Sequence, residues 1–273
     1  MKKKHNISFV GGGNMGQALI ESLLNYDSNF LNIHVIDLNP DLLSFLSKRF
    51  AITTSKEIDS KIIKSDVIVL VIKPQDLSKV CKSLIPFLKK QLIISLVAGI
   101  NSDNLNKMLN GYKHIVRVMP NTASKIRKSI SGVFCLPEVC ENKKKFVDII
   151  LQAVGKTIWF TEESKIDTIT AVSGSGPAYI FYFFEVIEKA AIQLGLSKKE
   201  AREVVLETFI GSTEMIKQID KSPFELREKV TSKGGTTFAA VNFMEQELIG
   251  EKIIKAIHLA KLRCKEINEE FGK

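Results

Sequence analysis

The sequence predicts an α/β domain with a parallel sheet, followed by an all-α domain. In the first part of the 273-residue chain, short segments of strand-like composition alternate with amphipathic segments, as in successive βαβ units. A glycine-rich turn follows the first of these segments, and strand signals stop at about Thr161. We therefore predict two domains, residues 1–161 and 162–273.

Seven segments of the first domain have the composition of strands. Val67–Ile72 is apolar at every position, as expected for a strand covered on both faces of a parallel sheet. The predicted strands are Ile7–Val10, Ile33–Ile36, Val67–Ile72, Leu92–Leu96, Ile115–Val118, Gly132–Leu136 and Thr157–Phe160. The helices predicted between them are Met15–Tyr26, Asp41–Phe50, Leu77–Leu88 and Asn142–Ala153.

The sequence of the second domain predicts helices throughout. They are predicted at Ala178–Leu194, Lys198–Gln218, Phe224–Val230, Phe238–Glu247 and Lys252–Glu269. The first of these is apolar around most of its circumference, which indicates burial on all sides. We favour packing against the same helix of a second subunit, so that this domain dimerises the protein. The alternative is a central helix in a monomeric bundle.

Composition and charge restrict the class of protein. Hydrophobic residues make up 45% and charged residues 25%, the balance of a globular protein. The apolar segment Ile7–Val10 is too short for an export signal, and Leu92–Ile100 is too short to span a bilayer. We therefore expect a cytoplasmic protein without a membrane partner.

The net charge of +9 does not indicate a nucleic-acid partner, because the lysines are scattered and no aromatic residues interleave with them. A positive field of this kind also attracts anionic substrates and dinucleotides. The cysteines fit no zinc or redox spacing, so we expect reduced thiols and no metal site. They are Cys81, Cys135, Cys140 and Cys264.

The glycine-rich turn predicts a dinucleotide site. Gly11, Gly13 and Gly16 form G-x-G-x-x-G between a strand and a helix. The first glycine permits a tight turn, the second lets the backbone approach a pyrophosphate, and the third lets helix and strand pack closely. Asn14 and Met15, at the start of the helix, belong to the same predicted cofactor site, where backbone N–H groups face the phosphates. The first domain is therefore of the Rossmann type.

Asp37 stands 21 positions after Gly16, at the end of the second predicted strand. An acidic residue here bonds the ribose hydroxyls of NAD and repels the additional phosphate of NADP. Alternatively, Asp37 only shapes the turn into the next helix. The first interpretation favours NADH modestly, and the predicted cofactor is NADPH or NADH.

Five motifs distributed over nearly the whole chain resemble those of pyrroline-5-carboxylate reductases. The most specific is Val230–Val241, with Pro223 before it and Glu245 after it. The others, in the family's order, are Val71–Gln75, Ser95–Gly99, Arg117–Thr122 and Ser173–Tyr179.

The resemblance implies the last step of proline biosynthesis. NADPH or NADH would reduce 1-pyrroline-5-carboxylate to L-proline by hydride transfer to the imine carbon. It also implies homodimers that complete each other's active sites and assemble further into rings. The motifs place Lys73, Pro74, Ala98 and Asn121 at the cofactor. From the residues alone, Lys73 could instead be solvated, and Asn121 could be an ordinary turn residue.

A substrate site is predicted at the start of the helix that includes Phe238. Ser232, Gly234, Gly235, Thr236 and Thr237 precede or open this helix, whose free N–H groups and dipole form an anion site for the carboxylate. The resemblance assigns to the Thr237 hydroxyl a contact with the imine nitrogen and hence a catalytic role. The alternative is that Thr236 or Thr237 only caps the helix.

Two departures from the family pattern affect the loops. Lys233 stands where the family usually has proline, and residues 123–128 lack the usual glycines. Two other functions compete. A β-hydroxyacid dehydrogenase would need a lysine four residues after Gly176, where Ile180 stands, and would have no general base. A non-catalytic dinucleotide-binding protein would not need residues 234–237.

Overall fold

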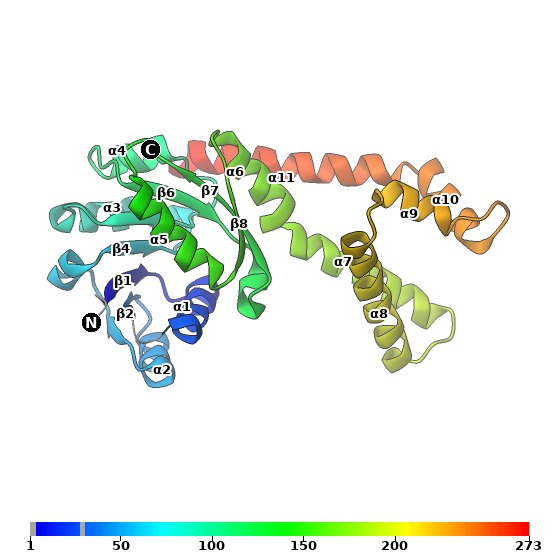
Figure 1. The fold of residues 1–273 in the computed structure, drawn as a ribbon, viewed down its shortest axis with the longest axis horizontal. Helices are drawn as coiled ribbons and strands as arrows, with labels where there is room; N and C mark the ends of the chain where they lie inside the picture. The colour runs from blue at the N-terminus through cyan, green and yellow to red at the C-terminus, as the bar shows by residue number, and fades with distance from the viewer. Residues whose placement is uncertain (1–3, 28–30, 273) are drawn as a thin grey trace. The chain divides into compact units, whose positions relative to one another are not determined.

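The chain was analysed as a computed structural model, which describes residues 4–27 and 31–272. Its residues group into two compact units. The first contains residues 1–177 together with 259–273, and the second contains residues 178–258. The second unit lies within the helical region predicted to begin at residue 162. Figure 1 traces the order of the elements along the chain.

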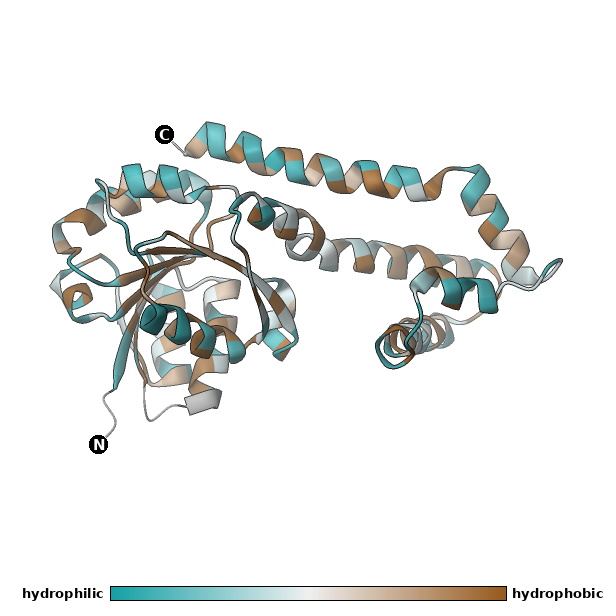
Figure 2. Ribbon diagram, turned by 45° about the horizontal axis from the view of Figure 1, so that its top comes forward, coloured by the Kyte–Doolittle hydropathy of each residue, from teal (hydrophilic) through white to brown (hydrophobic). Residues whose placement is uncertain are grey.

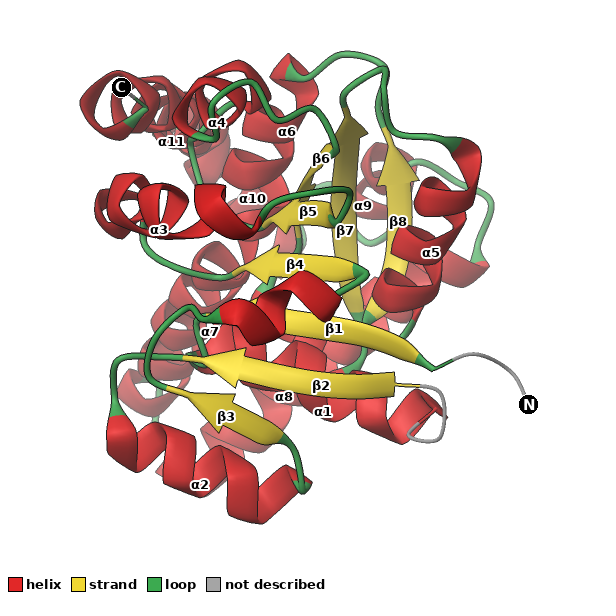
Figure 3. Ribbon diagram, turned by 90° about the vertical axis from the view of Figure 1, so that its left-hand side faces the viewer, coloured by secondary structure: helices red, strands yellow, loops and turns green. Residues whose placement is uncertain are grey.

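Within the described residues, the first unit contains an eight-stranded sheet with the order β3-β2-β1-β4-β5-β6-β7-β8. All neighbouring strands are parallel except β6 and β7, which are antiparallel. The parallel strands β1, β2, β4 and β5 point the same way in Figure 3. The strands are β1 His5–Val10, β2 Leu31–Ile36, β3 Thr53–Ser55, β4 Val67–Leu70, β5 Leu92–Ser95, β6 Ile115–Met119, β7 Ser129–Cys135 and β8 Gly155–Trp159.

Helices cover both faces of this sheet. The α-helices of the first unit are α1 Asn14–Asp27, α2 Pro40–Phe50, α3 Leu77–Leu84, α4 Ser102–Met108, α5 Glu141–Gln152 and α6 Ser164–Ile169. On β4, Val67 and Val69 pack with α1, α2 and α5, whereas Ile68 and Leu70 pack with α3 and α4. This alternation explains why β4 is apolar throughout. Figure 2 shows the central strands as hydrophobic.

Short one-turn elements connect these strands and helices. The 3-10 turns are η2 Ser60–Lys64, η3 Pro74–Asp76, η4 Ile85–Phe87 and η5 Thr122–Ile126, and a π-helical turn, η6, covers Thr170–Gly174. The predicted helix Leu77–Leu88 is therefore α3 followed by η4, in which Pro86 interrupts the α-helical hydrogen bonds.

The seven predicted strands are confirmed, with ends that differ by a few residues. Besides the one-turn elements, one strand and two α-helices were not predicted, namely β3, α4 and α6. β3 is three residues of Thr and Ser on the edge of the sheet, so it has no apolar alternation to detect. α4 and α6 are seven and six residues long, too short for a clear helical period.

The second unit is helical, and its strand-free sequence prediction is confirmed. The chain enters it along α7 Gly176–Gln193 and leaves it along α11 Ile249–Phe271. The remaining helices are α8 Lys198–Gln218, α9 Pro223–Lys229 and α10 Thr236–Gln246. α8 and α9 both begin with capping boxes, at Ser197–Glu200 and Ser222–Glu225, which satisfy the first N–H groups.

The apolar helix α7 is not enclosed by the other helices of its unit. No residue of α7 is buried, and Phe181 is 68% exposed. The monomeric bundle considered from the sequence is therefore not what the described chain forms. The other α7 side chains that are large, apolar and exposed are Ile180, Tyr182, Val186, Ile187 and Ile192. Within the described residues, no helix has both the length and the hydropathy needed to cross a membrane.

Candidate active site

The turn between β1 and α1 has the geometry that the glycine motif predicts. Gly11 has φ +105°, a conformation that side chains rarely adopt, and its N–H donates to the Ile36 carbonyl at 2.8 Å. A Cβ on Gly16 would lie 2.7 Å from the Gly11 oxygen, whereas a Cβ on Gly13 would meet no described atom within 4 Å. Gly16 is thus required by packing, and Gly13 leaves the backbone open to a phosphate.

Asp37, directly after β2, is tied into this turn. One carboxylate oxygen accepts a 2.8 Å hydrogen bond from the Gly12 N–H, and the other accepts a 3.0 Å bond from the Asn39 N–H. Asn39 in turn caps α2 through its side chain. Asp37 therefore shapes the turn, as the alternative interpretation predicts, and it also supports the glycine loop. A ribose contact would use the remaining lone pairs of the same carboxylate.

The predicted cofactor residues follow neighbouring strands at the carboxyl edge of the sheet. Gly11 follows β1, Lys73 follows β4, Ala98 follows β5 and Asn121 follows β6. Because β1, β4, β5 and β6 are parallel neighbours, the fold brings these loops to one edge, where open α/β sheets bind ligands. Lys73 is exposed and extended, with φ −74° and ψ 148°, as predicted for a residue before proline.

Asn121 makes more contacts than a turn residue requires. Its side-chain oxygen accepts from the Ala123 N–H at 3.1 Å and caps η5. Its side-chain amide donates to the Ser173 hydroxyl at 3.1 Å, and its backbone N–H donates to the Ser129 hydroxyl at 3.1 Å. The side chain is thus held between the loop after β6 and the turn η6.

The loop that departs from the family pattern is a compact turn. Arg127, at the end of η5, has φ +58° and ψ +30°, a left-handed conformation that glycine adopts more readily. Its side-chain Nε donates to the Ala153 carbonyl at 3.1 Å. An arginine therefore occupies a conformation that favours glycine, and a hydrogen bond to the segment before β8 anchors its side chain.

The second unit contains the predicted substrate loop. Gly234 has φ +77°, and the Gly235 N–H donates to the Ser232 carbonyl at 2.9 Å. Gly235 is the N-cap of α10, with no side-chain hydrogen bond to the first turn. Thr236 and Thr237 are the first two residues of the helix, so neither is its cap. The first N–H groups of α10 therefore have no side-chain partner, which is the condition for an anion site.

A buried ionic cluster was not found from the sequence. Arg117, on β6, has a side chain that is 3% exposed and pairs with Glu163 and Asp167. The only sequence signal is one charged residue inside the apolar run Ile115–Met119.

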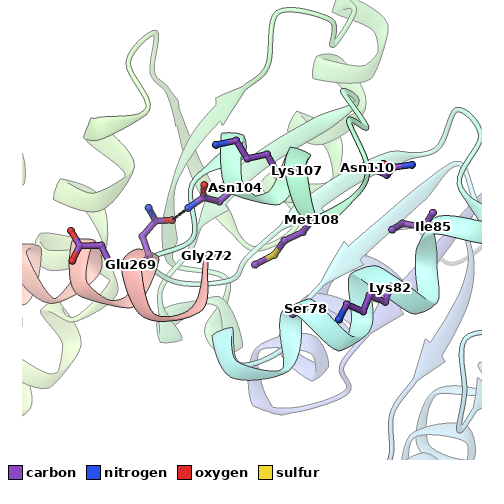
Figure 4. A pocket seen from close by; sticks show the side chains of 10 residues that line it. Ser78, Lys82, Ile85, Asn104, Lys107, Met108, Asn110, Glu269 and Gly272 are labelled. Carbon is purple, nitrogen blue, oxygen red and sulfur yellow. Dashed lines mark hydrogen bonds between the residues drawn. The ribbon is translucent and has the colours of Figure 1, made fainter.

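A separate pocket of about 760 Å³ lies between α3, α4 and the end of α11 (Figure 4). Asn104 and Asn268 line it and are hydrogen-bonded to each other at 3.1 Å. None of the predicted site residues lines this pocket. It therefore does not represent the predicted dinucleotide site.

Comparison with family models covers most of the chain. The model described as pyrroline-5-carboxylate reductase dimerisation matches residues 163–267. The model described as NADP oxidoreductase, coenzyme F420-dependent, matches residues 6–99, the segment that contains the glycine turn. The first match covers the helices of the second unit and supports the motif assignment made from the sequence.

Individual proteins agree with these matches. Pyrroline-5-carboxylate reductase of Haemophilus influenzae is 37% identical over 268 residues, covering 97% of this chain and 98% of that protein. A structure of the enzyme from Coxiella burnetii is 37% identical, with a TM-score of 0.85 over 97% of this chain and 99% of that one. Plasmodium falciparum pyrroline carboxylate reductase, solved with NADP bound, is 27% identical, with a TM-score of 0.87 over 97% and 98%. This chain therefore belongs to the pyrroline-5-carboxylate reductase family.

Proposed function

We propose that this protein reduces 1-pyrroline-5-carboxylate to L-proline with NADPH or NADH, the last step of proline biosynthesis. The observation that carries the proposal is the start of α10, where Gly234 and Gly235 leave the first N–H groups without a side-chain cap. The substrate is a small cyclic imine with a carboxylate, and such a helix start recognises a carboxylate. Relatives at 37% identity are pyrroline-5-carboxylate reductases.

The first unit fits a dinucleotide. Gly13 leaves room for the pyrophosphate, and α1 directs its N-terminus toward the same turn. We assign cofactor contacts to Gly11, Gly13, Asn14, Met15, Gly16 and Asp37, and to Lys73, Pro74, Ala98 and Asn121 at the same edge of the sheet. When bound, the nicotinamide supplies the hydride.

We assign substrate binding to Ser232, Gly234, Gly235, Thr236 and Thr237. The glycines let the carboxylate approach the N–H groups of α10 without a Cβ in the way. The Thr237 hydroxyl does not cap α10, because Gly235 is the N-cap residue. We propose that the Thr237 hydroxyl oxygen accepts a hydrogen bond from the N–H of the protonated imine and orients the C=N bond for reduction. The proton on nitrogen comes from water, so no histidine or lysine is needed as a general acid.

We further propose that the protein acts as a cytoplasmic homodimer formed by the helical domain, which we place at residues 162–273. The support is the exposed apolar surface of α7, which includes Phe181 at 68% exposure, together with the match to a dimerisation model at residues 163–267. Large apolar side chains exposed together on one helix indicate an interface. The family resemblance also implies that the dimers assemble into larger rings.

The function is tested with the purified chain, NADPH or NADH, and 1-pyrroline-5-carboxylate. We expect cofactor absorbance to fall and L-proline to appear in equal amount. A β-hydroxyacid dehydrogenase would instead oxidise a β-hydroxyacid with NAD(P), a reaction for which the chain has Ile180 in place of the required lysine. Cofactor binding without turnover on either substrate would reject the enzyme and support a dinucleotide-binding protein.

A further inference from the structure

Arg117 is a buried charge in a strand that otherwise consists of apolar side chains. The whole residue is 2% exposed, and every residue of β6 is buried. A guanidinium in such a place is costly unless acidic groups and hydrogen bonds compensate it. Arg117 therefore requires acidic partners within the fold.

Two carboxylates from one helix compensate this charge. Arg117 Nη1 lies 2.7 Å from Glu163 Oε1, and Arg117 Nη2 lies 3.2 Å from Asp167 Oδ1. Glu163 immediately precedes α6 and Asp167 lies within it, and both side chains are 21% exposed. The planar guanidinium fixes the direction of both bonds. Arg117 therefore holds α6 against β6 at a defined position.

Glu163 also holds the beginning of α4. Its carboxylate accepts from the Ser102 N–H at 2.6 Å and from the Ser102 hydroxyl at 2.5 Å. The preceding residue, Asn101, donates its N–H to the Asn268 side chain at 3.0 Å. The loop between β5 and α4, which contains Ala98, is therefore fixed at its end by two side chains.

The same helix leads to the other loop of the carboxyl edge. α6 continues into η6, where the Ser173 hydroxyl accepts the side-chain amide of Asn121 at 3.1 Å. Arg117 and Asn121 are four residues apart in the chain. The segment from β6 to η5 is thus attached to the α6–η6 segment at both ends, once by ion pairs and once by a hydrogen bond.

We propose that Arg117, Glu163 and Asp167 are positioning residues for the reductase. They set the β5–α4 and β6–η5 loops, and through them Ala98 and Asn121, at the cofactor. The inference rests on the proposed function in assigning those two residues to the cofactor. A displacement of about 1 Å in a reacting group can cost roughly 100-fold in rate, so loop placement is enough to affect turnover without contact to the reacting atoms.

Glu163→Gln tests the proposal while preserving size and one acceptor oxygen. Dissociation constants for NADPH without substrate, kcat, both KM values and Tm are measured. We expect weaker NADPH binding and a kcat/KM lowered by roughly 10- to 100-fold. Ser102→Ala should lower NADPH affinity and kcat/KM by a smaller factor, because the backbone N–H of residue 102 still donates to Glu163. Ser102→Thr keeps the hydroxyl and should keep both values close to those of the wild type. Lys113→Met is the matched control, since it removes an ion pair of 2.8 Å with Glu138 just before β6 begins.

If Arg117, Glu163 and Asp167 only stabilise the fold, the same measurements give a different result. The proposal is overturned if Glu163→Gln and Ser102→Ala lower Tm while NADPH affinity, kcat and KM per folded molecule equal those of Lys113→Met. If Glu163→Gln does not fold, the comparison of Ser102→Ala with Ser102→Thr decides. NADPH affinity is measured without an imine. If the wild type fails to reduce 1-pyrroline-5-carboxylate, the proposed function is rejected, but the NADPH affinities of the variants can still be compared.

Discussion

The carboxylate of Asp37 accepts a 2.8 Å hydrogen bond from the backbone N–H of Gly12. The residue that is expected to discriminate between NADH and NADPH therefore also supports the turn that holds the pyrophosphate. A substitution that removes the carboxylate changes both properties, and two variants are needed to separate them.

Asp37→Asn and Asp37→Ser are expected to raise the efficiency with NADPH relative to NADH, because each removes a negative charge that repels the 2′-phosphate. Loss of about 1.4 kcal/mol of repulsion corresponds to roughly tenfold in the ratio. Asp37→Asn keeps one acceptor oxygen for the Gly12 N–H but loses the one that faces the Asn39 N–H, so it should lower Tm less than Asp37→Ser does. Steady-state kinetics with both cofactors check this, and an unchanged ratio in both variants would assign Asp37 to the turn alone.

Thr237→Ala is expected to lower kcat/KM with little change in Tm, since Gly235 and not Thr237 is the N-cap of α10. A hydrogen bond to a charged group contributes about 1.5–3 kcal/mol, which corresponds to roughly 10- to 150-fold. Thr237→Ser retains the hydroxyl and most of the activity. Thr231→Ala is the control, because that hydroxyl bonds the Arg227 carbonyl at 2.6 Å. A Thr237→Ala enzyme with wild-type kcat/KM would reject the catalytic role.

Phe181→Asp is expected to weaken the dimer. Phe181 is 68% exposed on α7. The Phe184 ring, in contrast, has its centroid 5.7 Å from that of Phe209, and the Arg202 guanidinium lies over it. A charge at Phe184 would therefore damage the fold as well. An anchoring aromatic residue contributes about 2 kcal/mol or more, or roughly 30-fold in the dimer dissociation constant. Light scattering measures the mass of both proteins. A wild-type chain that is monomeric at micromolar concentration contradicts the dimer.

His34 is expected to make stability depend on pH. Its ring nitrogens bond the hydroxyls of Thr53 and Ser55 at 2.9 and 3.0 Å. Burial, and then the charge of Lys61, lower its pKa below the ordinary 6.5. The unfolded chain therefore binds the proton more tightly, and the free energy of unfolding falls as pH decreases below about 6.5.

Thermal melts across this pH range compare the wild type with His34→Gln, which cannot be protonated. The variant should lose less stability on acidification. Equal slopes in the two proteins would show that His34 contributes nothing to the pH dependence. His114 contributes in the same direction, because burial and Lys143 also lower its pKa, so the variant keeps part of the slope.

The sheet was predictable because its strands carry their own signal. Val67–Leu70 is buried on both faces and apolar throughout, and Gly11 and Gly16 mark a turn in which a Cβ would clash with the backbone. β3 was missed because three polar residues on a sheet edge carry no periodicity. Its position depends on pairing with β2, which is a tertiary property.

The part of the candidate site that depends on glycine could be predicted from local sequence. The part that depends on contacts between residues far apart in sequence could not. Gly235 was correctly placed at the start of α10, but its identity as the N-cap, which frees Thr237, depends on backbone geometry. The Arg117–Glu163 pair joins residues 46 positions apart. No local pattern links them, so only the fold shows that they meet.

The central claim is hydride transfer from the nicotinamide to the imine carbon of 1-pyrroline-5-carboxylate. The most direct measurement uses NADPH with deuterium at the transferable position and determines the label in the product by mass spectrometry and NMR. We predict one deuterium per proline, on the ring carbon that was the imine carbon, for each NADPH oxidised. Oxidation of NADPH without labelled proline, or binding of NADPH with no oxidation when the imine is present, would contradict it.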